Sequence, residues 1–323
     1  MKKLPLNENL KMVPSVVPAF RVQTLSEVTD YNHDLMNIPE AWRKSRGEGV
    51  KVAILDTGTP THRDLKVAGS SSFIAGYGLD MAGHATFCGG IISATADNGI
   101  GIKGIAPGCE CYYGAVLDQY GSGSTRSLIE GIYWAVGIKV QILNLSLGIP
   151  AMFHVDPALE KACDYAYSNG VTIFASAGND SGDVNCPARY DSVIAVAAVD
   201  RKQKLADFSS KGPEVEFAAG GVDVFSTFLN NSYASMSGTS FSCPAVAAVG
   251  ALIQSDFKKR TGLFLKPSDL RDELRKIAYD VGPEGRDEEF GWGIPVFRKD
   301  PRVPVKPKTQ SFWKRLWNKI RMR

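Results

Sequence analysis

The sequence lacks several features that would assign it to a whole class of proteins. Among its 323 residues no apolar run approaches the roughly 20 residues needed to cross a bilayer, so we expect no membrane-spanning helix. The net charge of +3 is too small to indicate nucleic-acid binding. Near the N-terminus Asn7, Glu8 and Lys11 interrupt what would be the apolar core of a secretion signal. We therefore predict a cytoplasmic protein.

Cysteine and histidine are also scarce. Six cysteines are scattered along the chain, and only Cys109 and Cys111 are close, without the paired spacing of a metal site. In a reducing compartment we expect free thiols. A catalytic base must come from four histidines: His33, His62, His84 and His154.

What the sequence does contain is an alternation of short apolar runs and helical stretches. Strands are predicted at residues 50–56, 111–117, 140–148, 170–178 and 191–200, and helices at 84–93, 124–136, 157–168 and 245–253. This alternation is typical of an α/β fold, in which a mainly parallel twisted sheet carries helices on both faces. Functional residues then gather at the carboxyl ends of the strands.

The chain divides into three parts. Residues 1–46 lack strong periodicity and contain four prolines, so we interpret them as an N-terminal extension. Residues 47–297 carry the α/β pattern. Residues 298–323 form a proline-containing linker and a basic tail, in which Trp313, Leu316, Trp317 and Ile320 fall on one face of a helix.

The stretch SMSGTSFSCPAVAAVGALIQ (235–254) places Ser240 just before an apolar helix. We expect Pro244 in the first helical turn, where its missing N–H needs no partner. Ser240 would then lie where backbone N–H groups attract an anion. It is either an N-cap or a nucleophile, and a nucleophile needs a base and a carboxylate elsewhere.

Two residues can supply those groups. His84, in MAGHATFCGGIISA, begins a predicted helix after a glycine and is the best-placed base. Asp56, in AILDTGTPTHRDLK, ends a predicted strand, although an Asp before Thr-Gly often makes only a turn. The combination of all three contexts points to a catalytic triad.

These motifs resemble the subtilisin-like serine proteases (subtilases). VAILDTGTPTHRDL, GHATFCGGII, LNLSLG, ASAGND and MSGTSFSCPAVAA occur in that family's order and spacing, over roughly residues 50–296. The resemblance implies a three-layer sandwich fold and a serine endopeptidase. It also implies that Ser240 attacks the peptide carbonyl, that His84 transfers the proton, and that Asp56 orients His84.

The same resemblance implies further site residues. Asn179 would complete the oxyanion hole with the Ser240 N–H. Substrate-binding positions would be Gly121, Ser122, Gly123, Ser146, Leu147, Gly148, Ser176, Ala177 and Gly178. The first three and Ser146–Gly148 would pair with the substrate backbone. Small wall residues favour a large apolar side chain before the cleaved bond.

The sequence departs from the family pattern at four positions near the triad. They are Ala85 (usually Gly), Phe87 (usually His), Phe241 (usually Met) and Ala245 (often His). None of them removes a catalytic group, so they bear on specificity and fine geometry.

TADNGIGIKGIAPG resembles the family's calcium loop, and Ca²⁺ prefers oxygen ligands. The resemblance implies as ligands the Asp64 carboxylate, the Asn98 side chain and the carbonyls of Ala96, Ile100 and Ile102. The alternative is a plain Asn-Gly turn. Cys88 and Cys243 lie close to the triad in sequence and are expected to be small buried residues.

Both ends of the chain leave alternatives open. LKMVPSVVPAF resembles the N-terminal segment of intracellular subtilisins that blocks the active site until it is cleaved, but it could be a plain arm. The basic tail suits a membrane surface or another partner, or it folds back onto the domain. For the whole protein, the alternative to an endopeptidase acting on polypeptides is a catalytically silent peptide-binding protein. An esterase would need the order Ser, Asp, His, which is not found here.

Overall fold

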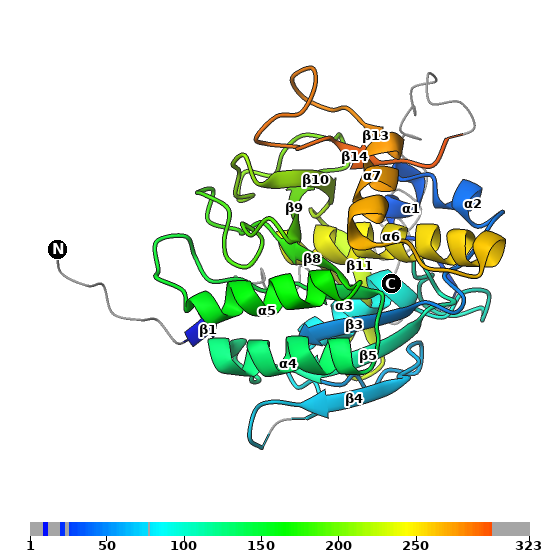
Figure 1. Cartoon of the computed structure of the whole chain (residues 1–323). Coiled ribbons are helices and arrows are strands. Elements are labelled where there is room, and N and C mark those ends of the chain that lie inside the picture. Colours follow the sequence, from blue (N-terminus) through cyan, green and yellow to red (C-terminus); the bar gives the residue numbers. More distant parts are fainter. Residues whose placement is uncertain (1–8, 12–19, 23–25, 77, 299–323) are drawn as a thin grey trace.

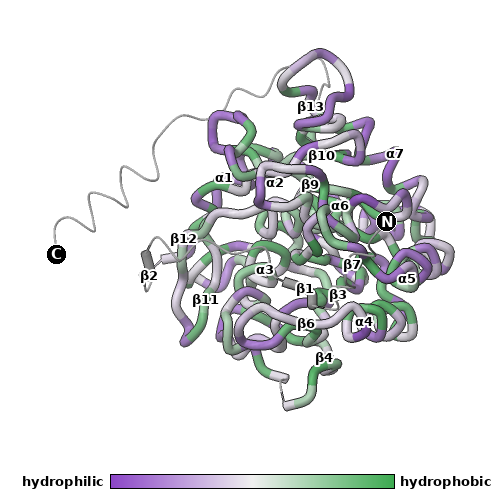
Figure 2. The backbone as a smooth tube through the Cα atoms, turned by 90° about the vertical axis from the view of Figure 1, so that its left-hand side faces the viewer, coloured by the Kyte–Doolittle hydropathy of each residue, from purple (hydrophilic) through white to green (hydrophobic). Residues whose placement is uncertain are grey.

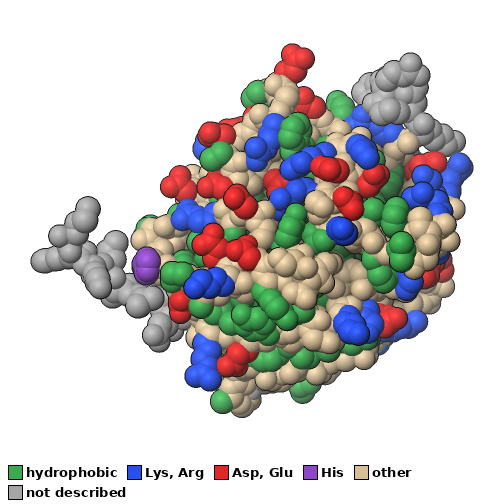
Figure 3. Space-filling model, viewed as in Figure 1, with side chains coloured by type: hydrophobic (Ala, Val, Ile, Leu, Met, Phe, Trp, Pro, Cys, Tyr) green, Lys and Arg blue, Asp and Glu red, His purple; other side chains and the backbone are tan. Residues whose placement is uncertain are grey.

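The computed structural model describes residues 9–11, 20–22, 26–76 and 78–298 (Figure 1). The basic tail that we predicted to be an amphipathic helix lies outside these residues. Among the described residues, no helix has both the length and the apolar character needed to cross a membrane. On the face drawn in Figure 3, basic and acidic side chains are interspersed, in line with the small net charge.

A seven-stranded sheet forms the centre of the described chain. Its order is β10–β9–β8–β7–β3–β5–β4, and every pair of neighbours is parallel. The strands are β3 (Lys51–Asp56), β4 (Gly69–Ser72), β5 (Glu110–Ala115), β7 (Ile142–Leu145), β8 (Thr172–Ser176), β9 (Val193–Val199) and β10 (Val215–Gly220). The central strands are almost wholly buried, as expected where helices cover both faces.

Helices cover the sheet on both sides. On one face lie α4 (Thr125–Gly137) and α5 (Pro157–Ser168), and on the other α3 (His84–Ser93) and α6 (Thr239–Thr261) (Figure 1). The predicted α/β class, with a mainly parallel sheet between two helical layers, is confirmed. Local sequence sets the helix starts: the Ser124 hydroxyl accepts a hydrogen bond from the Ser127 N–H, and Asp156 caps α5 ahead of Pro157.

Helix α6 begins earlier than we predicted, and this changes the position of Pro244. The helix starts at Thr239, so Pro244 lies in its second turn and not in its first. Its missing N–H leaves the Ser240 carbonyl, four residues back, without a helical partner. The Ser146 hydroxyl (2.8 Å) and the Cys88 thiol (3.4 Å) donate to that carbonyl instead. Through the free Ser240 carbonyl, the proline thus allows the start of α6 to hydrogen-bond with Ser146 after β7 and with Cys88 in α3.

Residues shortly before the predicted division at residue 46 pack into the main core. Residues beyond Asp30 form α1 (Tyr31–Leu35) and α2 (Ile38–Ala41), and Met36 and Ile38 are fully buried in the main core. The short lengths of these helices explain why no periodicity was visible in the sequence. The part of the extension from about residue 30 onward therefore belongs to the globular body.

Smaller sheets lie around the central one. β2 (Phe20–Val22) joins β11 (Val224–Phe228) and β12 (Ser232–Met236), and β1 (Asn9–Lys11) pairs with β6 (Ser122–Ser124) (Figure 2). Helix α7 (Pro267–Ile277) packs on α6, and β13 (Ala278–Tyr279) pairs with β14 (Ile294–Pro295).

The strand order identifies where a site should lie. The chain runs from β3 to β5 on one side of the sheet and later places β7 on the other side of β3. At such a reversal the crevice beyond the carboxyl ends of the strands is open to a ligand. Asp56 ends β3 at this position, Ser146 follows β7, and Ser176 ends β8.

Candidate active site

Asp56 and His84 form a buried pair at the end of β3 and the start of α3. The two carboxylate oxygens of Asp56 lie 2.8 and 2.9 Å from His84 Nδ1. Both residues are at most 1% exposed. Because Nδ1 faces a carboxylate, it carries a proton, which leaves Nε2 on the far side of the ring as the free base.

Asp80 holds the first turn of α3 in place. Its carboxylate accepts hydrogen bonds from the backbone N–H groups of Gly83 (2.7 Å) and Thr86 (2.7 Å) and from the Thr57 hydroxyl (2.8 Å). Gly83 has φ +85°, and a Cβ there would lie 2.5 Å from the Phe228 ring, so only glycine fits. These contacts fix the residues directly before and after His84 and so position it at the start of α3.

Ser240 lies in the first turn of α6 and is 1% exposed. Its hydroxyl donates to the Ser146 carbonyl at 3.3 Å, while His84 Nε2 is buried and has no hydrogen-bond partner among the described residues. The serine–histidine hydrogen bond of a working triad is therefore not formed in this structure. Such bonds are often long or misaligned before substrate binds, and a rotation about the Ser240 Cα–Cβ bond changes the acceptor.

The electrostatics favour a charged His84. Burial alone lowers the pKa of this imidazole, but the negative charge and hydrogen bond of Asp56 outweigh it and hold the pKa well above 6.5. Cys88 lies 3.9 Å from Nδ1, and burial raises the pKa of its thiol, so it contributes no charge at neutral pH. The neutral base is thus favoured by alkaline conditions.

Asn179 follows β8 beside the start of α6. Its Oδ1 accepts from the Thr239 backbone N–H (2.8 Å) and the Thr239 hydroxyl (2.7 Å). A backbone N–H can only donate, so this oxygen assignment is fixed by the network. The amide nitrogen of Asn179 is the remaining group, and it lies close to Gly238, two residues before Ser240. It is available to donate to an oxyanion.

The predicted substrate-binding residues fall into three segments around the pair. Ser122 and Gly123 belong to β6, preceded by Gly121 in a left-handed conformation (φ +73°). The others lie at or directly after the ends of β7 and β8: Ser146, Leu147, Gly148, Ser176, Ala177 and Gly178. All six of these are buried. The Ser176 hydroxyl donates to the Leu147 carbonyl at 3.5 Å, which joins the two segments.

The N-terminal part of the chain lies on one of these segments. Strand β1 pairs antiparallel with β6, with Leu10 opposite Gly123 and Lys11 opposite Ser122. Further along, β2 pairs with β12, and Phe20 lies opposite Ser235, shortly before Ser240. Residues 12–19, which connect the two, are outside the described residues. The backbone of β1 therefore occupies the edge predicted for substrate.

The residues predicted for calcium gather around the buried Asp64. Its carboxylate accepts from the Asn98 amide (2.7 Å) and the Ile102 N–H (3.2 Å). Burial raises the pKa of Asp64, and the nearby charge of Glu27 raises it further. The carbonyls of Ala96, Ile100 and Ile102 accept no hydrogen bond from any described residue.

Glu27 was missed from the sequence. Its carboxylate accepts from the Asn98 N–H at 3.2 Å and pairs with the Lys103 ammonium at 2.9 Å. Two adjacent carboxylates and three carbonyls without donors are a set that a hard cation satisfies, so these residues fit Ca²⁺. The Lys103 ammonium, which pairs with Glu27, would compete with Ca²⁺ for that carboxylate. No motif marked Glu27, because it lies about 37 residues before Asp64.

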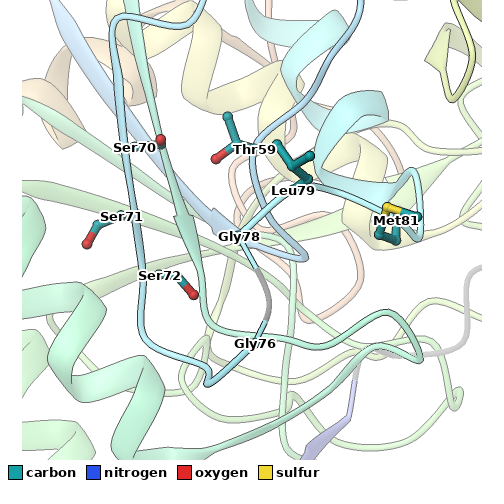
Figure 4. A pocket seen from close by; sticks show the side chains of 8 residues that line it. All are labelled: Thr59, Ser70, Ser71, Ser72, Gly76, Gly78, Leu79 and Met81. Atoms are coloured by element: carbon teal, nitrogen blue, oxygen red, sulfur yellow. The ribbon is translucent and has the colours of Figure 1, made fainter.

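A hollow of about 560 Å³ lies beside β4 and the segment leading to α3 (Figure 4). It is lined by Thr59, Ser70, Ser71, Ser72, Gly76, Gly78, Leu79 and Met81. None of these is a predicted site residue, and the lining has no acid, base or convergent set of donors. We therefore place the chemistry at Asp56 and His84 and not in this hollow.

Comparison with known proteins agrees with this geometry. Residues 47–293 match the model of the Subtilase family. The chain is 40% identical to the minor extracellular protease Epr of Bacillus subtilis over 84% of this chain and 43% of that protein. It is 40% identical to a thermostable alkaline protease of Halalkalibacterium halodurans, over 87% and 76% of the two chains. With subtilisin DY of Bacillus licheniformis it shares 42% identity, over 73% and 86%.

The chain thus spans less than half the length of the first of these relatives and about three quarters or more of the other two. The family match covers more than half of the chain and includes Asp56, His84, Asn179 and Ser240. The chain belongs to the subtilase family, the subtilisin-like serine proteases.

Proposed function

We propose that the protein is a serine endopeptidase that cleaves polypeptides through an acyl-enzyme formed on Ser240. The Ser240 oxygen attacks the peptide carbonyl carbon while His84 Nε2 takes the hydroxyl proton. His84 then gives this proton to the leaving amine, and water hydrolyses the ester in the same way. Asp56 keeps Nδ1 protonated and stabilises the imidazolium. The Asn179 amide and the Ser240 N–H stabilise the negative oxygen.

The observation that carries this proposal is the buried Asp56–His84 pair, with the His84 base nitrogen left without a partner. A buried polar atom without a hydrogen bond destabilises the folded state. The unpaired nitrogen is explained if a serine hydroxyl or a substrate supplies the missing hydrogen bond during catalysis. A catalytically silent peptide-binding protein would not need this arrangement. Family membership adds support.

Substrate preference follows from the walls beside Ser240. Leu147, Ala177 and Gly178 are small or apolar and buried, and they carry no charge that would bind a basic or acidic side chain. We infer that a large apolar residue is preferred before the cleaved bond. A cleavage profile on denatured proteins tests this, and dominance of lysine or glutamate at that position would contradict it.

The test of activity uses Ser240→Ala, which removes one hydroxyl and leaves the start of α6 intact. Wild-type protein should hydrolyse casein and an apolar peptide anilide, and Ser240→Ala should not, with both giving the same circular dichroism spectrum. Ser242→Ala is the matched control, because its hydroxyl donates to the Thr239 carbonyl and Ser242 is not a predicted site residue. Wild-type turnover in Ser240→Ala would refute the assignment.

We also propose that the N-terminal segment inhibits the enzyme by occupying the substrate edge. Three residues of β1 take the antiparallel register on β6 that a substrate would use, and such pairing is a common way of binding an extended peptide. A substrate must displace β1 before it can bind. In this proposal the first 46 residues include a regulatory arm, and the peptidase domain follows it.

Deleting residues 1–20 tests this inhibition. The truncated enzyme should begin hydrolysis at its full rate, whereas the full-length enzyme should show a lag that ends as its N-terminus is removed. Full-length Ser240→Ala should keep an intact N-terminus. Equal initial rates for the two active forms would show that the segment does not inhibit.

Calcium is proposed as a structural ligand of the loop 95–103. When bound, it would neutralise the adjacent charges of Asp64 and Glu27 and hold the loop against β12 through Tyr233, whose hydroxyl donates to Asp64. Gly101 (φ +65°) is required there, because any side chain would collide with Asp64 and Tyr233. The cation takes no part in the reaction.

The location of the protein and the role of its basic tail are also proposals. We propose a cytoplasmic enzyme, although the first relative named above is called extracellular. We also propose that residues 308–323 bind an anionic surface and have no part in catalysis. No specific nucleic-acid binding is proposed.

A further inference from the structure

Two thiols lie side by side at the start of β5, away from the triad. Cys109 immediately precedes the strand and Cys111 is its second residue, so their side chains lie on the same face. Their Sγ atoms are 3.8 Å apart. All six cysteines are within the described residues and are free thiols, and no other two of them are in hydrogen-bond contact.

The two thiols differ in access. Cys111 is 1% exposed, whereas Cys109 is only partly buried. A reagent from solution therefore reaches Cys109 first. Gly47 of the neighbouring loop packs close to this residue, since a Cβ there would lie 3.3 Å from Cys109 Cβ.

The two thiols also differ in acidity. The two Sγ atoms are in hydrogen-bond contact, in which either thiol can be the donor, and the Cys111 thiol also lies within donating distance of the Ser93 hydroxyl oxygen at 3.1 Å. The contact with Cys109 is the main cause that lowers the pKa of Cys111 despite its burial, and the same contact raises the pKa of Cys109. Cys111 is therefore the thiol that gives up its proton more readily.

A metal would need more ligands than this pair offers. Zinc in a structural site takes four protein ligands. Among the described residues, the one group of three or more His, Cys, Asp or Glu with converging ligand atoms is Asp56, His84 and Cys88, at the triad. Tyr113, the next residue on the same face, keeps its proton because burial raises the pKa of its hydroxyl. The pair is better suited to redox chemistry.

We propose that Cys109 and Cys111 form a thiol–disulfide exchange site that low-molecular-weight disulfides such as glutathione disulfide oxidise to an intrachain disulfide. The Cys109 sulfur, once deprotonated, attacks one sulfur of the reagent, and the reagent's S–S bond breaks to release one thiolate. The Cys111 thiolate then attacks Cys109 Sγ and expels the second thiolate. The two protein protons end on the two released thiols, and the protein loses two electrons to the reagent.

Closing the disulfide breaks few contacts of the fold. The Sγ atoms must approach from 3.8 Å to about 2.05 Å. Ser93 loses only an S–H neighbour, because its own hydroxyl proton is donated to the Gly89 carbonyl at 3.3 Å. No buried donor is left without a partner. The ring spans three residues, so it constrains the unfolded chain little and should change the melting temperature by only a few degrees.

The experiment uses full-length Ser240→Ala protein, which cannot digest itself. It is incubated with glutathione disulfide at neutral pH, the remaining thiols are alkylated after denaturation, and peptides are analysed by mass spectrometry. We expect the peptide with Cys109 and Cys111 to be two hydrogens lighter and not alkylated. Cys163 and Cys186, both buried with raised thiol pKa, should stay alkylated. Dithiothreitol should reverse the change.

Two single variants separate the roles of the thiols. In Cys111→Ser the reaction should stop with glutathione attached to Cys109, because no second thiol is near. In Cys109→Ser modification of Cys111 should be at least tenfold slower than that of Cys109 in Cys111→Ser, because Cys111 is buried. Circular dichroism of each variant shows whether it has folded.

Three results would overturn the proposal. One is a wild-type protein that accumulates glutathione on Cys109 without closing the disulfide. Another is a pair that stays reduced when Cys163 or Cys186 has reacted. The third is a pair inert to the disulfide but shielded from alkylation by Cd²⁺ alone, which would make it a metal site.

Discussion

Acidification should destabilise the protein through the buried His33. This side chain is 3% exposed, its Nε2 lies 3.3 Å from the Gly104 carbonyl, and its Nδ1 has no hydrogen-bond partner. Burial, with a smaller contribution from the Lys103 charge, lowers the pKa of His33 to about 4. An unfolded histidine titrates near 6.5. Between about pH 6.5 and pH 4 the unfolded chain therefore binds a proton at His33 and the folded protein does not.

The direction and size of the pH effect on the free energy of unfolding follow from this difference in pKa. A depressed histidine pKa contributes stability that is fully present above pH 6.5 and is lost as pH falls toward 4. At pH 5 the loss from His33 alone is about 2 kcal/mol. His62 is 6% exposed and burial lowers its pKa to about 4 as well, so it should lose a similar amount. Together these would lower the melting temperature by roughly 8–16 °C.

Other groups act in the opposite sense, so a matched variant is needed. Burial raises the carboxyl pKa of Asp30, Asp64 and Glu216, and such groups gain stability on acidification. The assay is urea unfolding of Ser240→Ala protein at pH 7.5 and pH 5, with and without His33→Phe. The phenyl ring keeps the edge contact with Trp42.

His33→Phe should reduce the loss of unfolding free energy between the two pH values by about 2 kcal/mol, whatever its effect at pH 7.5. His154→Gln, at an exposed position, should leave that loss unchanged. If His33→Phe loses as much stability as its parent on acidification, His33 is not a buried neutral group and the reasoning is refuted.

Three further predictions concern the metal, the triad and the tail. Excess chelator should lower the melting temperature of wild-type protein, because a cation bound only to the native state stabilises it, and Asp64→Asn should no longer respond; identical responses would refute the site. Phe241, buried 5.6 Å from the His84 ring, should make activity resist peroxide, since no thioether lies beside the nucleophile; rapid inactivation of a Cys88→Ala, Cys243→Ser variant would contradict this. Deleting residues 308–323 should leave hydrolysis of a small peptide unchanged and abolish sedimentation with anionic vesicles; failure of the full-length protein to sediment at low salt excludes the membrane role.

Most of the central sheet could be predicted from local sequence. Strands that are buried on both faces form continuous apolar runs, and this is why β3, β7, β8 and β9 were found within a few residues. Helices α3 and α5 were placed at the bounds that the structure gives, 84–93 and 157–168, because glycine and Asp-Pro mark their starts. The start of α6 was missed, since the effect of Pro244 depends on Ser146 and Cys88, which are distant in sequence.

Only part of the candidate active site could be predicted from the sequence. Asp56, His84 and Ser240 lie in motifs with recognisable spacing, but Asp80 and Glu27 act through contacts that no local pattern marks. Asp80 could have been suspected as an acidic residue shortly before a helix start. The resemblance of residues 10–20 to an inhibitory segment suggested that this part of the chain could lie at the active site, but the pairing of β1 with β6 is non-local and its register could not be predicted.

The measurement that tests the central claim most directly is labelling with a fluorophosphonate, followed by mass spectrometry of the modified peptide. Protein lacking residues 1–20 is used, so that β1 does not cover the site. We predict one adduct per molecule on Ser240, loss of hydrolysis in proportion to labelling, and no adduct in His84→Ala. Full hydrolysis without an adduct, or an adduct on another serine that accounts for the loss of activity, would contradict the account.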